Sequence, residues 1–172
     1  CYEDSNRSGI MKDIFIDTNI AKNFATPLDP HYKELIKWIN EFDEELVEKE
    51  PNRLLDFAHL VVSQKLLVEY LKSSRDCSKP NAIPSIINRL QIQGRIQKKT
   101  KTEIEEFTKQ YFSKKTVKNL LSNKEDHCHI VCVLISNRKL CLTYDDNLTA
   151  DLKGFPGHIV TVEKRPENLN YK

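Results

Sequence analysis

Four acidic side chains of this sequence stand beside apolar segments, where they could do chemistry. Asp17 ends the apolar run Ile14–Ile16, and Asp145 follows the segment "KLCLTY". Glu69 lies within "QKLLVEYLKS", and Asp126 lies within "SNKEDHCHIVCVLIS". Carboxylates that converge repel each other strongly, and a divalent cation compensates such clusters. Because every ligand atom of this set is an oxygen, the pattern favours Mg²⁺ or Mn²⁺ as the cofactor.

Each acidic residue also has an ordinary structural role open to it. Asp17 could cap the helix that follows it, and Asp126 could simply favour a helix N-terminus. Asp145 could be a turn residue. Glu69 could pair with a lysine of its own helix, a surface interaction of only about 0.3–0.5 kcal/mol. The joint occurrence of the four, in the order Asp, Glu, Asp, Asp, is less easily explained this way.

The elements that would position these side chains alternate along the chain. Apolar runs predict strands at Ile14–Asp17, Ala58–Ser63, Lys139–Tyr144 and His158–Val162. Helices are predicted between them, which indicates an α/β fold: three α/β/α layers around a central, mostly parallel sheet of four or five strands. Such sheets bind ligands beyond the carboxyl ends of their strands, where Asp17 and Asp145 are placed.

Local signals mark where several helices begin. Asp29 followed by Pro30 is a favourable start, with an aspartate cap and a proline in the first turn. Ser63 is placed to cap the helix "QKLLVEYLKS". A capping box of Ser122 and Glu125 predicts the start of the helix that carries Asp126. A short helix is expected near Asn147–Leu152.

The middle of the chain is strongly basic. Residues 75–124 hold 12 Lys/Arg and 4 Asp/Glu, a net charge of +8, whereas the rest holds 15 and 21, a net charge of −6. Residues 83–121 are predicted to form two or three helices without clear strands, so that residues 75–121 read as a basic helical insert. Gly94 and "GRIQKKTK" predict a bend between helices. The residues expected to bind nucleic acid are Arg95, Lys98, Lys99, Lys101, Lys114 and Lys115, with Arg89 and Lys118 nearby.

Two alternative roles for the basic region stay open. Its lysines could simply cover solvated helix faces, or they could dock an acidic protein partner. If they bind a single-stranded nucleic acid, affinity should fall with salt, with a log–log slope of about −0.7 per phosphate neutralised.

The ordered acidic motifs resemble those of the PIN domain, a family of metal-dependent nucleases. Members open with an apolar strand that ends in Asp-Thr-Asn or Asp-Ser-Asn, matched by Asp17-Thr18-Asn19. A Glu in the helix after the second strand is matched by Glu69, and an Asp early in a later helix by Asp126. The Thr-x-Asp that ends a strand is matched by Thr143-Tyr144-Asp145. The resemblance extends from Met11 to about Leu169, but residues 75–121 match nothing specific.

The resemblance implies hydrolysis of phosphodiester bonds by a Mg²⁺- or Mn²⁺-dependent endonuclease. Asp17, Asp126 and Asp145 would be the first ligands, and Glu69 would be a ligand or would orient the water. Thr18, Asn19, Thr143 and Asp146 would support them, and Asp146 could replace Asp145. The products would carry a 5′ phosphate and a 3′ hydroxyl. Small members are often ribonuclease toxins of toxin–antitoxin pairs, so the resemblance favours RNA as substrate, with an antitoxin protein or a homodimer as further partners.

Length and composition indicate how many domains the chain forms and which classes of protein are excluded. The 172 residues, 30% charged and 39% apolar, suit a single soluble domain, expected to span residues 11–172. Met11 is expected to be the natural start, with residues 1–10 an added or disordered extension. No run approaches the ~20 apolar residues of a membrane span, and no signal peptide is visible. Five cysteines, an odd number, favour free thiols and a cytoplasmic location.

Two non-nuclease hypotheses remain. The chain could be a PIN-like scaffold that binds RNA or a protein partner without cleaving, although the complete acidic set argues against it. "DHCHIVC" suggests zinc, because Cys128 and Cys132 share a helical face with His129 nearby. Structural zinc sites usually need two separated pairs of ligands, and only one cluster is present.

Overall fold

The computed structural model describes residues 9–74 and 76–172. The expected extension, residues 1–10, falls mainly outside this part of the chain. The strands are β1 (Lys12–Ile16), β2 (Ala58–Ser63), β3 (Ile96–Lys99), β4 (Leu140–Leu142) and β5 (Thr161–Glu163). The α-helices are α1 (Thr18–Ala21), α2 (Pro30–Asn40), α3 (Glu44–Lys49), α4 (Gln64–Ser73), α5 (Ile83–Ile92), α6 (Lys101–Tyr111), α7 (Lys114–Asn119), α8 (His127–Leu134) and α9 (Asp146–Gly154). The 3₁₀ helices within the described residues are η1 (Pro51–Asp56), η2 (Lys124–Asp126) and η3 (Pro166–Asn168).

The five strands form one parallel sheet in the order β3-β2-β1-β4-β5. β1 lies at the centre, where Ile14 is opposite Leu60 of β2 and Ile16 is opposite Leu142 of β4. The predicted α/β class and the mostly parallel sheet of four or five strands are therefore confirmed.

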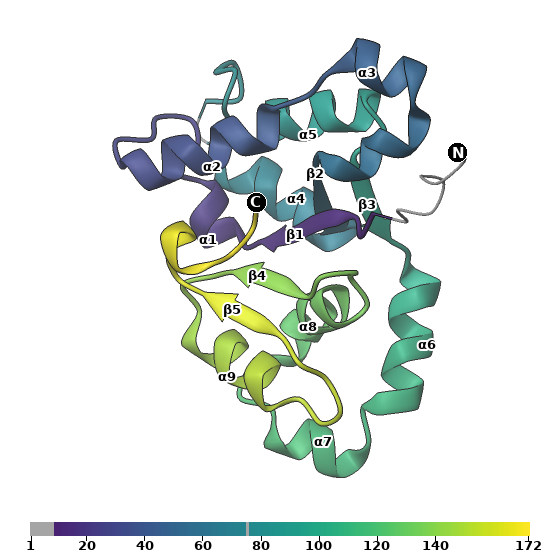
Figure 1. Ribbon diagram of the computed structural model, residues 1–172. Helices are drawn as coiled ribbons and strands as arrows, with labels where there is room; N and C mark the ends of the chain where they lie inside the picture. Colours follow the sequence, from purple (N-terminus) through teal and green to yellow (C-terminus); the bar gives the residue numbers. More distant parts are fainter. Residues whose placement is uncertain (1–8, 75) are drawn as a thin grey trace, which may run out of the picture.

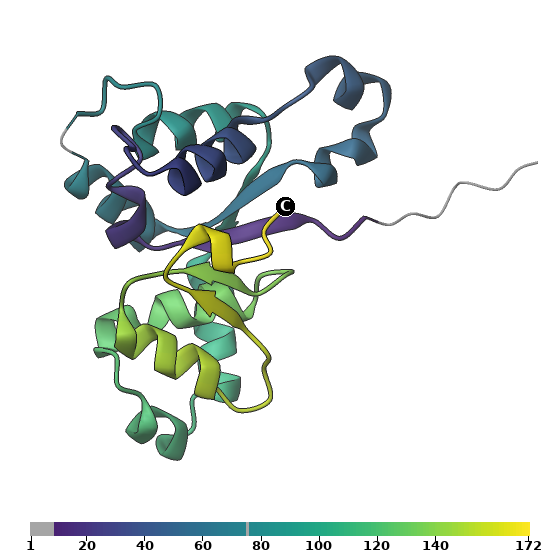
Figure 2. The same cartoon turned by 60° about the vertical axis from the view of Figure 1, so that its left-hand side comes forward.

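Helices cover both faces of the sheet, which explains why its central strands are apolar on both sides. All six residues of β2 are buried, from Ala58 to Ser63. In Figure 1, α2, α4 and α5 lie on the upper side of β1, and α8 and α9 lie on the lower side. Figure 2 shows the same separation from another direction. The three layers follow from the chain path, because right-handed crossovers put helices on opposite faces when the direction of strand addition reverses.

That reversal occurs between β1 and β4. The chain adds β2 and then β3 on one side of β1, and it returns across the sheet to add β4 and then β5 on the other. The carboxyl ends of β1 and β4 therefore border the crevice that such sheets use for ligands. Asp17 follows β1 directly, and Asp145 lies three residues beyond the end of β4.

Several predicted helix starts are confirmed by their caps. The Asp29 side chain accepts a hydrogen bond from His31 N at the start of α2. Ser63 Oγ accepts from Leu66 N at the start of α4 (3.1 Å). Ser63 is both the last residue of β2 and the cap of α4, so the strand passes into the helix without a loop. This short junction fixes where the first turns of α4 lie.

The helices predicted within residues 83–121 are confirmed as α5, α6 and α7, but the prediction of no clear strand there is wrong. Ile96–Lys99 forms β3, an edge strand that pairs with β2 between Leu60 and Ser63. The segment reads poorly as a strand because only Ile96 is apolar, and lysines are typical of exposed edge strands. The bend at Gly94 exists, with φ of +70°, but it joins α5 to β3 rather than two helices. Residues 75–121 therefore contribute a strand to the sheet and are not purely a helical insert.

The predicted capping box of Ser122 and Glu125 is also wrong. The chain forms the 3₁₀ turn η2 there, α8 begins only at His127, and neither start has a side-chain cap. Asp151 of α9 instead accepts the backbone N–H groups of Leu121 and Ser122 (2.8 Å each). This anchor replaces the local cap and holds the segment that carries Asp126.

None of the helices within residues 9–74 and 76–172 combines the length and the apolar character that crossing a membrane would require.

Candidate metal centre

A cavity of about 360 Å³ lies at the carboxyl edge of the sheet, and all four predicted carboxylates line it. They reach it from four parts of the chain. Asp17 follows β1, Glu69 lies in α4, Asp126 ends η2 and Asp145 precedes α9. The other lining residues are Thr18, Asn19, Lys22, Ser73, His129 and Leu148. We call this space the acidic cavity.

Asp17 is the deepest of the four, with 9% of its surface exposed. Its Oδ1 accepts from Thr18 N (2.7 Å), and its Oδ2 accepts from Asn19 Nδ2 (2.9 Å) and Thr143 Oγ1 (2.5 Å). Asp17 also stands at the cap position of α1, so the ordinary structural role holds for it as well. Asn19 and Thr143 thus both donate hydrogen bonds to Asp17, a contact of the kind that the resemblance implies for their positions.

Burial is the largest influence on Asp17 and raises its pKa. The hydrogen bond from Thr143, the charge of His129 and the N–H of Thr18 oppose the rise but do not cancel it. The charge of Asp145 adds to it. A buried carboxylate that is costly to ionise gains from a nearby cation, because opposite charge favours the ionised form.

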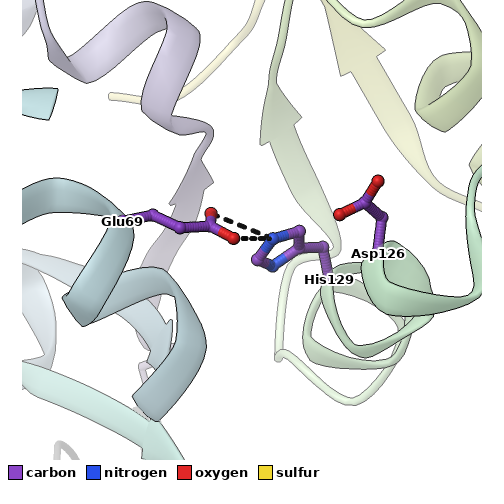
Figure 3. Close-up of side chains that lie close together, drawn as sticks. All are labelled: Glu69, Asp126 and His129. Atoms are coloured by element: carbon purple, nitrogen blue, oxygen red, sulfur yellow. Dashed lines mark hydrogen bonds and ion pairs between the residues drawn. The ribbon is translucent and has the colours of Figure 1, made fainter. Parts of the chain in front are cut away.

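Glu69 lines the same cavity as Asp17 and contacts Thr18 and His129. Thr18 Oγ1 donates to Glu69 Oε2 (3.3 Å), and His129 Nε2 lies 3.2 Å from the same oxygen. Figure 3 shows the Glu69 carboxylate pointing at the His129 ring, with Asp126 on the far side. The next residue, Tyr70, donates its hydroxyl to the carbonyl of Ile16. This bond ties α4 to the end of β1 and brings Glu69 to the edge where Asp17 lies.

Glu69 and His129 shift each other's pKa in opposite directions. Burial would raise the pKa of Glu69, but the hydrogen bond and charge of His129, with the charge of Lys65, lower it overall. Burial would lower the pKa of His129, but Cys128 and Glu69 outweigh it and raise the pKa to about 9. The pair is therefore an ionised carboxylate against an imidazolium near neutral pH.

Asp126 is paired with a lysine from another helix. Lys65 Nζ donates to Asp126 Oδ1 (2.8 Å) and to the carbonyl of Glu125, and it lies 3.6 Å from Glu69 Oε1. The expected pairing of Glu69 with a lysine on its own helix is thus partly true. Lys65 connects α4 to η2 and carries a positive charge against two of the four carboxylates.

The structure distinguishes Asp145 from Asp146. Asp145 lines the acidic cavity, and its Oδ1 caps α9 by accepting from the N–H groups of Asn147 (2.8 Å) and Leu148 (3.0 Å). Asp146 is exposed and pairs with Lys164 (2.7 Å) outside the cavity. Asp146 therefore has no supporting contact with the other carboxylates and does not take the place of Asp145.

The donor set fits a divalent cation, although charge alone does not require one. Glu69, Asp126 and His129 each offer one ligand atom within 4.8 Å of the others. This trio differs from the predicted first ligands, because Asp17 and Asp145 line the cavity but stand outside the tightest group. Carboxylates with an imidazole suit Mn²⁺, whereas Mg²⁺ prefers oxygen alone. His129 could ligate a metal only after losing its proton, and the ammonium of Lys65 repels a cation bound at Asp126 and Glu69.

Several residues predicted to bind nucleic acid do not reach the cavity. Arg95 is wrong as a nucleic-acid contact, because it is completely buried and donates to the carbonyls of Ile39 and Ala58 (3.0 Å each). Burial lowers the pKa of Arg95 to about 10. Arg89 is tied to Asn40 and Pro80 within the fold. Three lysines are exposed on α7 but line neither this cavity nor the groove beside it: Lys114, Lys115 and Lys118.

The remaining predicted lysines form a second hollow beside the first. A groove of about 560 Å³ is lined by Lys98 and Lys99 of β3, Lys101 of α6 and Lys65 of α4. We call it the lysine groove. It is bounded on the side of α8 by Cys128, the neighbour of His129. The lysines lie at the carboxyl end of an edge strand and not at the tip of a bend, as the sequence had suggested.

The cysteines do not form a zinc site among the described residues. Cys132 is buried in the core, and burial raises its pKa to about 12, which disfavours the thiolate that zinc requires. The metal-capable group includes His129 but neither Cys128 nor Cys132.

Sequence reasoning missed two cationic side chains, His129 and Lys65, that contact carboxylates of the acidic cavity. His129 stands out in the sequence only as a neighbour of cysteines, although its spacing of three residues from Asp126 places both on one side of the helix start. Lys65 was expected only as a surface partner of Glu69. Its bond to Asp126 joins segments 61 residues apart, and nothing in the local sequence indicates it.

Comparisons of this chain with protein-family models, with curated proteins and with solved structures found no match.

Proposed function

We propose that this protein is a metal-dependent endonuclease that hydrolyses phosphodiester bonds, with RNA as substrate. One observation carries the proposal: Asp17, Glu69, Asp126 and Asp145 converge on one cavity at the carboxyl edge of a parallel sheet. The order and spacing of these residues are those that resemble the PIN domain. The choice of RNA over DNA comes from that resemblance, as do the expected products with a 5′ phosphate and a 3′ hydroxyl.

The predicted residues of the acidic cavity would each have their own role in this reaction. Asp17, Asp126 and Asp145 would supply carboxylate oxygens for Mn²⁺ or Mg²⁺, with Glu69 as a further ligand. Such a cation would polarise the scissile phosphate and acidify the attacking water. Glu69, kept ionised by His129 and Lys65, would alternatively orient that water by accepting a hydrogen bond from it. Asn19 and Thr143 fix the orientation of Asp17.

A second candidate function is a scaffold that binds RNA without cleaving it. Lys65 and His129 favour it, because they neutralise Asp126 and Glu69 as a purely structural ion-pair network would. An antitoxin protein or a second copy of the chain remains a partner suggested by the resemblance alone.

Cleavage of an end-labelled single-stranded RNA tests the first candidate against the second. The wild-type protein should cleave with Mn²⁺ or Mg²⁺ and stop with EDTA, leaving 5′ phosphates. Asp17→Asn should lower the rate by more than about 100-fold, since even residues that merely support a metal ligand are worth about 10–100-fold. Asp146→Asn, prepared in the same way, should cleave like the wild type. Cleavage that persists in EDTA or in Asp17→Asn would contradict the mechanism, and RNA binding without any cleavage would favour the scaffold.

A further inference from the structure

Lys65 stands between the acidic cavity and the lysine groove. Its side chain lines the groove, while its ammonium contacts Asp126 Oδ1 (2.8 Å) and Glu69 Oε1 (3.6 Å), which belong to the cavity. The two hollows therefore share one positive charge. In the structure this charge is directed at the carboxylates.

The ammonium occupies atoms that a divalent cation needs. Asp126 and Glu69 are two of the three residues in the tightest metal-capable group. A cation and the ammonium of Lys65 cannot hold the same carboxylate oxygens without strong repulsion between like charges. Metal binding is therefore stronger when Lys65 turns elsewhere.

The ammonium group of Lys65 could turn into the lysine groove. Four lysines and one glutamate line it, which leaves an excess of positive charge. Lys98 Nζ donates to Gln64 Oε1 (2.9 Å), so an uncharged side chain holds it in place. The pair of Lys101 and Glu105 is 3.7 Å apart and exposed, an arrangement too weak to neutralise the groove. A phosphate of a nucleic-acid backbone complements this lining in charge.

Lys65 is able to move between the two hollows without a change in the fold. It lies in the first turn of α4, and 34% of its side chain is exposed. Its four-carbon stem lets the ammonium swing while the backbone stays fixed. The helix itself is held by the Ser63 cap and by the bond from Tyr70 to Ile16.

We propose that Lys65 is an exchangeable counter-ion that couples the two hollows. When a phosphate of a single-stranded nucleic acid enters the lysine groove, Lys65 leaves Asp126 and Glu69 for that phosphate. Asp126, with Glu69 still beside His129, then binds the divalent cation more tightly. The inference rests on the proposed function and names its regulation: the substrate completes the metal site. By linkage, the metal must strengthen nucleic-acid binding by the same factor.

Calorimetric titration with Mn²⁺ tests the coupling without relying on catalysis. The probe in the groove is a short oligouridylate with phosphorothioate linkages, and its own Mn²⁺ binding is subtracted. We expect the oligonucleotide to tighten Mn²⁺ binding to the wild type by about tenfold, within the usual range of coupling between sites. Without oligonucleotide, Lys65→Met should bind Mn²⁺ about tenfold more tightly than the wild type does. Adding the oligonucleotide should not increase the Mn²⁺ affinity of this variant further.

Two matched variants separate this coupling from a general charge effect. Lys72→Met removes an exposed lysine of the same helix outside both hollows and should behave like the wild type. The double variant Lys98→Gln/Lys99→Gln should keep wild-type Mn²⁺ affinity but lose the effect of the oligonucleotide. Circular dichroism establishes that each variant is folded.

The outcomes distinguish this inference from the proposed function. If wild-type protein binds no Mn²⁺ at all, the metal site is refuted, and the inference with it. If wild-type protein binds Mn²⁺ and cleaves RNA but Lys65→Met binds Mn²⁺ no more tightly, the counter-ion role alone is refuted. The same holds if the oligonucleotide leaves Mn²⁺ affinity unchanged.

Discussion

Asp145 and Asp146 allow the same chemical change to be made at two adjacent positions with opposite expected effects. Asp145 lines the acidic cavity, whereas Asp146 is exposed and pairs with Lys164. Replacement of either by Asn removes one negative charge. Asp145 also caps α9, but Asn caps helices about as well as Asp, so the unliganded stability of Asp145→Asn should change by less than about 0.5 kcal/mol. Any larger difference between the two variants must then come from the metal.

The magnitude follows from binding linkage and from Coulomb's law. At about 100 times its Kd, Mn²⁺ bound only to the folded state stabilises the protein by about 2.7 kcal/mol. For a domain of this size that raises Tm by roughly 5–10 °C. A unit charge within about 4 Å of another contributes about 4 kcal/mol at an effective dielectric of about 20. If solvent screens half of this energy, Asp145→Asn still weakens the free energy of Mn²⁺ binding by about 2 kcal/mol, which raises the Kd for Mn²⁺ about thirtyfold.

The assay is thermal unfolding followed by circular dichroism, with EDTA and then with a fixed concentration of Mn²⁺. The wild type and Asp146→Asn should show the full rise in Tm. Asp145→Asn should retain less than about 1 kcal/mol of metal stabilisation at the same concentration. An equal rise in Tm with Mn²⁺ in both variants would refute Asp145 as part of the metal site. If only Asp146→Asn lost the rise, Asp146 and not Asp145 would belong to the metal site.

Three further changes test the surroundings of the site. The pKa of His129 is raised to about 9, so protonated His129 should contribute fully to the free energy of unfolding below pH 6.5. This contribution should be lost as pH rises through 9. Urea unfolding in EDTA should show the loss in the wild type but not in His129→Gln. Asp151→Ala should cost about 3 kcal/mol in urea unfolding, because it leaves the N–H groups of Leu121 and Ser122 without their charged acceptor, and a cost below about 1 kcal/mol would contradict the anchor. Arg95→Lys should destabilise by at least about 2 kcal/mol, because one ammonium cannot replace the several bonds of the guanidinium, while RNA affinity stays unchanged if Arg95 is purely structural.

The sequence predicted the sheet and the convergence of the acidic residues for the same physical reason. Strands buried on both faces, such as Ala58–Ser63, are continuous apolar runs that stand out from their surroundings. Once these runs are strands of a parallel sheet, their carboxyl ends must share one edge. The placement of Asp17 and Asp145 follows from topology and needs no knowledge of side-chain packing.

What the sequence did not predict depends on contacts between distant segments. β3 is a strand because β2 offers it a backbone ladder, while its own residues, Ile96 to Lys99, carry only one apolar side chain. The capping box at Ser122 was outweighed by the carboxylate of Asp151, which comes from a different helix. Local propensity is a weak prior wherever a tertiary contact satisfies the same backbone groups.

Charge patterns proved the least specific of the sequence signals, and Arg95 and Lys65 show why. Both are cations, yet Arg95 is buried and donates to backbone carbonyls, whereas the ammonium of Lys65 contacts Asp126 of the acidic cavity. The net charge of residues 75–124 counts the buried Arg95 like an exposed cation, and the net charge of −6 of the rest gives no sign of Lys65. The presence of Lys65 and His129 also changes the argument for a metal, since the protein supplies its own positive charge to Asp126 and Glu69. The case for a cation then depends on Asp17 and Asp145, which line the same cavity and have neither of these cations as a hydrogen-bonded partner within residues 9–74 and 76–172. Their carboxylates, one of them buried with a raised pKa, are where a divalent ion would gain the most.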